Sequence, residues 1–251
     1  MPGDLPKLSK NRLKELARLK SKKHRLEEGQ VVVEGMRGLA QLQDYGVRPL
    51  EQYVTSGAKP LWEGVPAYEL QAGELAQLCA SEHPQGLAAL YPLPEPRRGD
   101  FRRAFYLDGI SDPGNLGTIF RVAASFGMDA ILLSPDCVEV SSPKVIRASL
   151  GSVFRVPFAT LDAAELVQTG AEVYATEASS GAPLADFIPR TGARIIVALG
   201  SEASGLSGQI RQSARGVLRI EMQAGMESLN VAVAAGIIAH HLYAQGRQFI
   251  N

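Results

Sequence analysis

The sequence predicts an α/β protein with a small N-terminal α/β domain and a larger C-terminal, mostly parallel sheet that has helices on both faces. From residue 104 on, short runs of apolar and β-branched residues alternate with helical patterns, which is typical of parallel strands joined by helical crossovers. Before this region, three prolines stand within residues 92–96, and such spacing disfavours a helix or an interior strand. We therefore expect a linker at residues 93–101.

The first 28 residues are expected to form a basic amphipathic helix. Between residues 4 and 25, nine lysines and arginines face only Asp4 and Glu15, while Leu13, Leu16 and Leu19 follow helical spacing. Such a helix is either a solvated surface element or a binding face for a polyanion. The charge run alone does not distinguish the two.

Residues 29–92 are expected to form the small α/β domain. The strands are predicted from runs of β-branched and aromatic residues, and the helices from apolar spacing that ends near glycine or proline. The expected strands are 31–33, 52–54 and 87–91, and the expected helices are 36–45 and 74–81.

Residues 102–251 are expected to form the parallel sheet and its helices. The expected strands are 105–107, 130–133, 173–175, 195–199 and 217–220. The expected helices are 116–126, 144–153, 163–168 and 231–244. The last helix is apolar on most faces and rich in small residues, so it should pack closely on several sides.

The composition indicates a soluble globular protein of the cytoplasm. Of the 251 residues, 45% are hydrophobic and 21% are charged, and the two cysteines stand far apart with no C-x-x-C context. The N-terminus lacks the apolar core of a signal peptide, and the longest apolar run is much shorter than the roughly 20 residues that cross a bilayer. The net charge is zero, but binding to a nucleic acid depends on where the charges lie.

The common nucleotide and metal motifs are missing from the sequence. No G-x-x-x-x-G-K-[ST] loop is present, and Gly114 and Gly117 do not continue into the G-x-G-x-x-G of dinucleotide-binding helices. The four histidines show no metal-ligand spacing, so no metal is expected. Phosphoryl transfer, hydride transfer and metal-dependent hydrolysis are therefore disfavoured.

Three polar, glycine-bearing loops follow predicted strands of the larger sheet, at the edge where open α/β sheets build their sites. In the first loop, Asn115 is expected to cap a helix, and Arg121 lies one turn after Gly117. A glycine there leaves bare backbone beside a guanidinium, which makes room for a substrate group. The second loop follows Leu199, and the third follows Ile220.

Together these loops resemble the three signature motifs of the SpoU (TrmH-type) branch of the SPOUT RNA methyltransferases. The family patterns are N-x-G-x-x-x-R, G-x-E-x-x-G-L-S and a strand followed by S-L-N. They appear here, in that order, at residues 115–121, 200–207 and 228–230. The resemblance covers about residues 105–242, and the preceding domain looks like the RNA substrate-binding domain that many members carry.

The resemblance implies an S-adenosylmethionine-dependent enzyme that methylates a ribose 2′-hydroxyl of RNA. Ribosomal RNA is favoured over transfer RNA because of the resemblance of the N-terminal domain. A homodimer and a C-terminal trefoil knot are also implied, the knot being a rare exception to the rule that chains do not thread loops. The implied cofactor-binding residues are Leu199, Gly200, Ile220, Met222 and Leu229, and the implied catalytic residues are Asn115, Arg121, Glu202, Ser228 and Asn230.

The implied chemistry assigns a specific role to Arg121. The ribose oxygen attacks the methyl carbon in line, so the protein must align two groups and manage one proton. The resemblance suggests Arg121 as the base, but an arginine has a pKa of about 12.5 to 13.8, so deprotonating it at pH 7 costs roughly 7 to 9 kcal/mol. General-base catalysis lowers the barrier by only roughly 3 to 5 kcal/mol. We therefore expect a charged Arg121 that clamps the RNA, with the proton leaving through phosphate or water. Asn115 and Glu202 are expected to hold Arg121 in place, and Ser228 and Asn230 to fix the third loop.

Two positions depart from the family pattern, and other functions are also considered. Glu221 stands where proline is common, and Ala232 where serine is frequent. The first departure is expected to alter the strand exit or the affinity for the cofactor. The alternatives are a transfer RNA 2′-O-methyltransferase, a ribosome-associated RNA-binding protein of the same fold without catalysis, and a nicotinamide-dependent oxidoreductase, which the missing glycine pattern disfavours.

Overall fold

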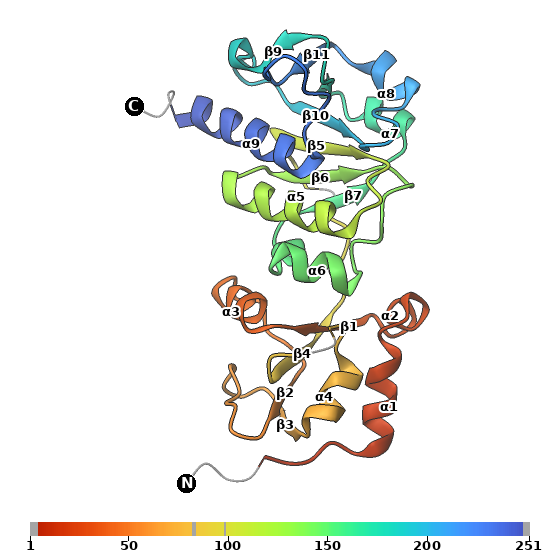
Figure 1. Cartoon of the computed structure of the whole chain (residues 1–251), viewed down its shortest axis with the longest axis vertical. Coiled ribbons are helices and arrows are strands. Elements are labelled where there is room, and N and C mark those ends of the chain that lie inside the picture. Colours follow the sequence, from red (N-terminus) through yellow and green to blue (C-terminus); the bar gives the residue numbers. More distant parts are fainter. Residues whose placement is uncertain (1–4, 82–83, 98, 248–251) are drawn as a thin grey trace. The chain divides into compact units, whose positions relative to one another are not determined.

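The computed structural model describes residues 5–81, 84–97 and 99–247 (Figure 1). Residues 1–4 of the expected first helix, Arg98 of the expected linker and residues 248–251 lie outside this range. The chain divides into two compact units, Met1–Pro94 with Glu139–Arg155, and Glu95–Val138 with Val156–Asn251. The expected domain boundaries stay a prediction, but the contacts group Glu139–Arg155 with the first unit rather than with the second.

The first unit contains a four-stranded sheet in the order β1-β4-β2-β3. Its central strand β4 runs antiparallel to both neighbours, and β2 and β3 are parallel. Three of these strands were expected, and β3 was missed because it is short and only half-buried. The strands are β1 (Gln30–Glu34), β2 (Glu51–Thr55), β3 (Ala67–Leu70) and β4 (Leu87–Pro92).

Two helices replace the single basic helix that the sequence predicts. Helix α1 (Lys10–Arg18) is followed by its C-cap residue Leu19, and α2 (Lys22–Glu28) begins after Ser21. The break is stabilised by Arg25, which is 3% exposed and whose Nη1 donates to the carbonyl oxygens of Leu19 and Lys20 at 3.1 and 2.8 Å. One continuous helix would leave this buried guanidinium without those acceptors. The leucines of α1 pack with α4 (Ala72–Leu78) in one hydrophobic core.

The segment Glu139–Arg155 adds a helix to the first unit. Helix α6 (Pro143–Ser149) contacts β1, as α3 (Met36–Asp44) also does. The helix expected at 144–153 ends early because Leu150 and Gly151 adopt positive φ angles of 49° and 79°. A Cβ on Gly151 would lie 2.7 Å from Leu42 Cγ, so this close packing on α3 requires glycine. A 3₁₀ turn, η1 (Ser152–Phe154), follows.

The second unit contains a seven-stranded sheet in the order β7-β6-β5-β10-β8-β11-β9, and every pairing is parallel. The predicted α/β class with a mostly parallel sheet is confirmed. Five strands were expected; the two edge strands were missed because they are only two and three residues long. The strands are β5 (Arg103–Asp108), β6 (Ala130–Leu133), β7 (Phe158–Thr160), β8 (Glu172–Thr176), β9 (Ala182–Pro183), β10 (Ile195–Gly200) and β11 (Gly216–Arg219).

Helices cover both faces of this larger sheet. Helices α5 (Pro113–Phe126) and α9 (Val231–Arg247) lie side by side and contact β6 and β10 (Figure 1). Helices α7 (Ala163–Gln168) and α8 (Gly208–Ser213) pack on alternate residues of the same strands from the other side. Helix α8 was not expected, because Ile210 is the single large apolar residue in its sequence and gives no apolar periodicity. In the part of the chain that the structure describes, no helix is long and apolar enough to cross a membrane.

Candidate functional site

The three loops singled out in the sequence meet in one hydrogen-bond network. Asn115 Nδ2 donates to Glu202 Oε1 at 2.7 Å, and Asn230 Nδ2 donates to the same oxygen at 3.1 Å. Asn230 Nδ2 also donates to Asn115 Oδ1 at 2.9 Å, which closes the triangle. The residues come from α5, from the loop after β10 and from the loop before α9, so side chains up to 115 positions apart in the chain are brought together.

The first loop begins its helix earlier than the sequence predicts. Helix α5 starts at Pro113, and its N-cap is Asp112, whose Oδ1 accepts from the Asn115 N–H at 2.7 Å. The expected capping role of Asn115 is therefore wrong. Proline at the first helical position fits this start, because its fixed φ is helical and its missing N–H would have no partner there. The Asn115 side chain is free to join the three-loop network.

Asn230, rather than Asn115, caps a helix with its side chain. Its Oδ1 accepts from the N–H groups of Ala232 at 3.0 Å and Val233 at 3.3 Å, at the start of α9. One amide thus caps α9 with its oxygen and reaches the other two loops with its nitrogen. Ala232 takes part only through its backbone, so the network does not need the serine that is frequent in the family.

The second loop turns back tightly on its own strand. A Cβ on Gly200 would lie 2.2 Å from the carbonyl carbon of Gly205, so no other residue fits at this turn. Gly205 N–H donates to the Ser201 carbonyl at 2.9 Å, and Ser207 N–H donates to Asp108 Oδ2 at 2.7 Å. Asp108 was not among the predicted site residues, although an acid at the C-terminal end of a central strand is a signal that could have found it.

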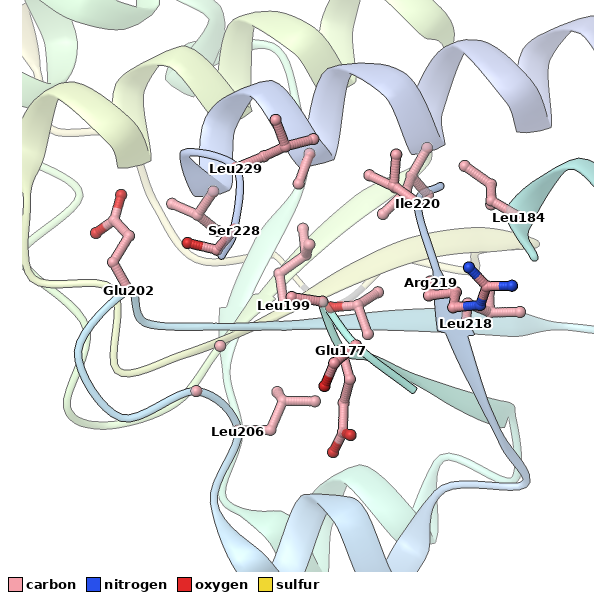
Figure 2. Close-up of a pocket in the computed structure, with 18 of the residues that line it drawn as sticks. Glu177, Leu184, Leu199, Glu202, Leu206, Leu218, Arg219, Ile220, Ser228 and Leu229 are labelled. Atoms are coloured by element: carbon pink, nitrogen blue, oxygen red, sulfur yellow. The ribbon is translucent and has the colours of Figure 1, made fainter. Parts of the chain in front are cut away.

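A cavity of about 430 Å³ opens beside these loops, and Figure 2 shows many of its lining side chains. This volume lies within the roughly 300–1,000 Å³ of pockets that bind small molecules. The five residues predicted to bind the cofactor all line it, as do two of the predicted catalytic residues. Those seven are Leu199, Gly200, Ile220, Met222, Leu229, Glu202 and Ser228.

The structure does not show the contacts expected around Arg121 and Ser228. Arg121 is exposed on α5, and its side chain makes no hydrogen bond or ion pair with any other described residue. Asn115 and Glu202 bind each other and Asn230 instead of holding the guanidinium. Within the same described ranges, Ser228 forms no hydrogen bond with Asn230, and it is Asn230 that binds the other two loops. The roles given to these five side chains stay a prediction.

A fourth loop contributes to the cavity and was missed in the sequence. It follows β8 and brings Glu177 to the lining, where the carboxylate lies 3.6 Å from Arg211 Nε. The sequence signal was an acid directly after a buried strand, in a Thr-Glu-Ala-Ser run. Among the described residues, no three His, Cys, Asp or Glu side chains gather in a group that could hold a metal ion.

Two known protein families match most of the chain. The SpoU rRNA Methylase family matches residues 102–240, and the MRM3-like substrate binding domain matches residues 10–89. The chain belongs to the SpoU rRNA methylase family. The predicted family is therefore confirmed, and the second match coincides with the region expected to bind RNA.

Individual SpoU relatives resemble the chain over nearly its whole length. A 23S rRNA (guanosine(2553)-2′-O)-methyltransferase, RlmP, of Bacillus subtilis is 29% identical over 238 residues, which are 92% of this chain and 95% of the relative. A tRNA/rRNA methyltransferase of Synechocystis whose function is not characterised is 31% identical over 94% of this chain and 90% of its own. A solved TrmH-family RNA methyltransferase structure from Porphyromonas gingivalis has a TM-score of 0.80 at 30% identity and covers 94% of this chain and 98% of its own.

Proposed function

We propose that this SpoU-family chain transfers a methyl group from S-adenosylmethionine to a ribose 2′-hydroxyl of ribosomal RNA, at the mouth of the cavity between its loops. The observation that carries this proposal is the Asn115–Glu202–Asn230 network, which joins the three family motifs beside the cavity. Two of those motifs also supply the cavity wall. The B. subtilis relative is named for the same reaction on 23S rRNA.

The residues of the cavity fit S-adenosylmethionine, which has an aromatic base, a ribose and a charged end. Apolar side chains such as Leu199, Leu218 and Ile238 form much of the lining and suit the base. The backbone N–H groups of Leu206 and Ile220 at this lining donate to no other described residue, so they are available to a ligand. Charged and hydroxyl side chains complete the wall. This donor set matches a cofactor that is held largely by backbone groups.

The chain's own residues would align the RNA and keep the loops in place. S-adenosylmethionine supplies an electrophilic methyl carbon when it is bound. Arg121, exposed and without a partner in the described chain, is available to bind a phosphate and the attacking hydroxyl as a charged clamp. Glu202 orients the amides of Asn115 and Asn230 and thereby fixes the relative positions of the loops. The hydroxyl proton would pass to phosphate or water, while Glu202 Oε1 stays engaged by the two amides.

A homodimer, a trefoil knot and a cytoplasmic location belong to the same proposal. Val233 and Ile237 are 51% and 39% exposed on successive turns of α9, an apolar stripe of the kind that dimer interfaces cover. The knot is supported by the path of the chain: β10 inserts between β5 and β8, and after β11 the chain returns as α9 to pack on α5. The cytoplasmic location rests on the sequence expectations.

The test is a map of ribose methylation in total RNA from cells with and without this gene, and from cells that carry the Arg121→Ala variant. We expect one or more 2′-O-methyl groups in ribosomal RNA to disappear without the gene and to stay absent with the variant. A loss confined to transfer RNA would show that the substrate is transfer RNA and not ribosomal RNA. Unchanged methylation in all RNA would overturn the proposal.

A further inference from the structure

Glu177 lies where the walls of the cavity meet. It follows Thr176 at the end of β8, and β8 lies between β10 and β11, the strands that lead into the second and third loops. The Glu177 N–H donates to the Leu218 carbonyl at 3.0 Å, which fixes the start of the fourth loop against β11. We propose that the Glu177 carboxylate binds the ribose hydroxyls of S-adenosylmethionine, with Arg211 as its positioning residue. This inference rests on the proposed function, because it assumes that the cavity takes this cofactor.

The Glu177 carboxylate is held in place and still has room for two donors. Its Oε1 faces Arg211 Nε at 3.6 Å, and its Oε2 accepts a hydrogen bond from the Ser180 hydroxyl. A carboxylate offers about four lone-pair sites, so about two remain. The side chain is 28% exposed, which leaves it accessible from the cavity that it lines. Two free acceptor sites match the two hydroxyl donors of a ribose.

Arg211 spans the gap between Glu177 and the second loop. It comes from α8 and passes over Gly205, where an added Cβ would lie 3.1 Å from Nη2. Its guanidinium attracts the Glu177 carboxylate and holds it at the cavity lining. The pair therefore links the fourth loop to the second.

The place of Glu177 in the cavity favours the ribose over the other parts of the cofactor. In Figure 2, Glu177 lies between Ser228 and Glu202 at one end and Leu184 at the other. Ser228 and Glu202 belong to the motifs that surround the proposed methyl-transfer centre. At the other end, beside Arg219, Leu184 and Leu218 provide apolar surface that suits the base. The ribose joins the base to the reacting sulfonium, so it belongs in the middle. Glu202 Oε1 is already occupied by two amides, which leaves Glu177 as the available acid.

Ribose hydroxyls and a carboxylate are complementary partners. The hydroxyls donate, an ionised carboxylate only accepts, and such charge-assisted bonds are roughly twice as strong as neutral ones. An acid that follows a strand serves the ribose in dinucleotide-binding sheets, which shows that the geometry at a strand end is suitable.

The test is calorimetric titration of the wild-type chain and of Glu177→Gln with S-adenosylmethionine, S-adenosylhomocysteine and 5′-methylthioadenosine. We expect the variant to bind all three about 10- to 100-fold more weakly, because all three carry the ribose. The matched control is Glu172→Gln, at the other end of β8, whose carboxylate pairs with Arg190 and Arg215 outside the cavity. It should bind all three as the wild type does.

The pattern of losses identifies the group that Glu177 contacts. A loss for S-adenosylmethionine alone would assign Glu177 to the sulfonium charge, and a loss that spares 5′-methylthioadenosine would assign it to the amino-acid end; either overturns the inference. The 2′-deoxy form of 5′-methylthioadenosine distinguishes a direct bond between Glu177 and a ribose hydroxyl from a general change in the shape of the cavity. We expect the variant to weaken its binding less, since one of the hydroxyls is missing, and an equal loss would overturn the inference. If the wild type binds none of these compounds, the proposed function itself fails.

Discussion

One carboxylate connects the three loops of the proposed site. Glu202 accepts from two side-chain amides through the same oxygen, and neither of these amide groups has another carboxylate partner among the described residues. A neutral side chain of similar size would accept the same bonds more weakly. We therefore assign the network the role of positioning the loops, and we assign the direct contact with RNA to Arg121.

Replacing Arg121 should separate catalysis from folding. Its side chain is exposed and unbonded within the described chain, so Arg121→Ala should leave the melting temperature and S-adenosylmethionine affinity close to those of the wild type. Loss of a positioned catalytic group should lower the single-turnover rate of methyl transfer at least about 10²-fold. Arg102→Ala, which removes another exposed arginine of the same unit, is the control and should keep the full rate. Near-normal turnover by Arg121→Ala would contradict the assignment.

The two cysteines should be unreactive in the folded protein. Burial raises the pKa of the Cys79 thiol to about 12, with the neighbouring Glu34 carboxylate adding to the rise. Burial also raises the pKa of the Cys137 thiol. Because the thiolate is the reactive form, labelling by a disulfide reagent at pH 8 should be slow in the native protein and fast in denaturant. Rapid native labelling of either thiol would show that its surroundings are more open than the structure indicates.

The sequence predicted which residues lie at the site better than it predicted their contacts. The motifs singled out Leu199, Gly200 and Ile220, and these residues line the cavity because each lies at or directly after the end of a strand. The capping of α5 was assigned to Asn115 instead of Asp112, since both residues favour helix starts and only the backbone decides between them. Glu177 was missed because its loop carries no motif, and its role depends on neighbours that are distant in the sequence.

The turn at the end of β10 is the element on which the second loop depends. Gly200→Ala would push a Cβ into the backbone of Gly205, so the loop must shift away from the cavity. We expect S-adenosylmethionine binding to fall at least about 10-fold in calorimetric titration, with a lower melting temperature. Gly208→Ala is the matched control, because an added Cβ at that first residue of α8 meets no atom within 4 Å. It should bind normally and be at least as stable. Normal binding by Gly200→Ala would contradict this view of the loop.

Elements with strong periodicity were predicted, and those shaped by distant contacts were not. Strand β6 and helix α7 have the expected bounds, because each follows a clear apolar pattern between turn residues. The basic helix divides into α1 and α2 because Arg25 folds onto the end of α1 and binds the Glu139 carboxylate with two bonds of 2.9 Å. These two residues are 114 positions apart, so local spacing carries no sign of the contact.

The same contact shows that the first unit is built from two separate parts of the chain. The side chains of Arg25 and Glu139 are 4% and 17% exposed, and removing one partner of such a pair typically costs about 3–5 kcal/mol. Leu13, Leu16 and Leu19 are also buried in the core of this unit. Deleting the first 26 residues would therefore unfold the unit and would not report on RNA binding. The charge of the basic segment has to be tested by substitution.

Lys10, Lys14 and Arg18 form an exposed stripe on α1 at four-residue spacing, and none forms an ion pair within the described ranges. If the stripe binds RNA phosphates, each contact contributes about 0.7 to 0.9 to the slope of log binding constant against log salt concentration. Replacing all three with glutamine should weaken RNA binding and flatten that slope by about 2 to 3, with S-adenosylmethionine affinity unchanged and much of the turnover restored at saturating RNA. Lys59→Gln, at an exposed lysine after β2, is the control and should leave the slope unchanged. Identical slopes for the triple variant and the wild type would mean that the stripe is only solvated, and would move the RNA contact to the sheet and loops of residues 30–92.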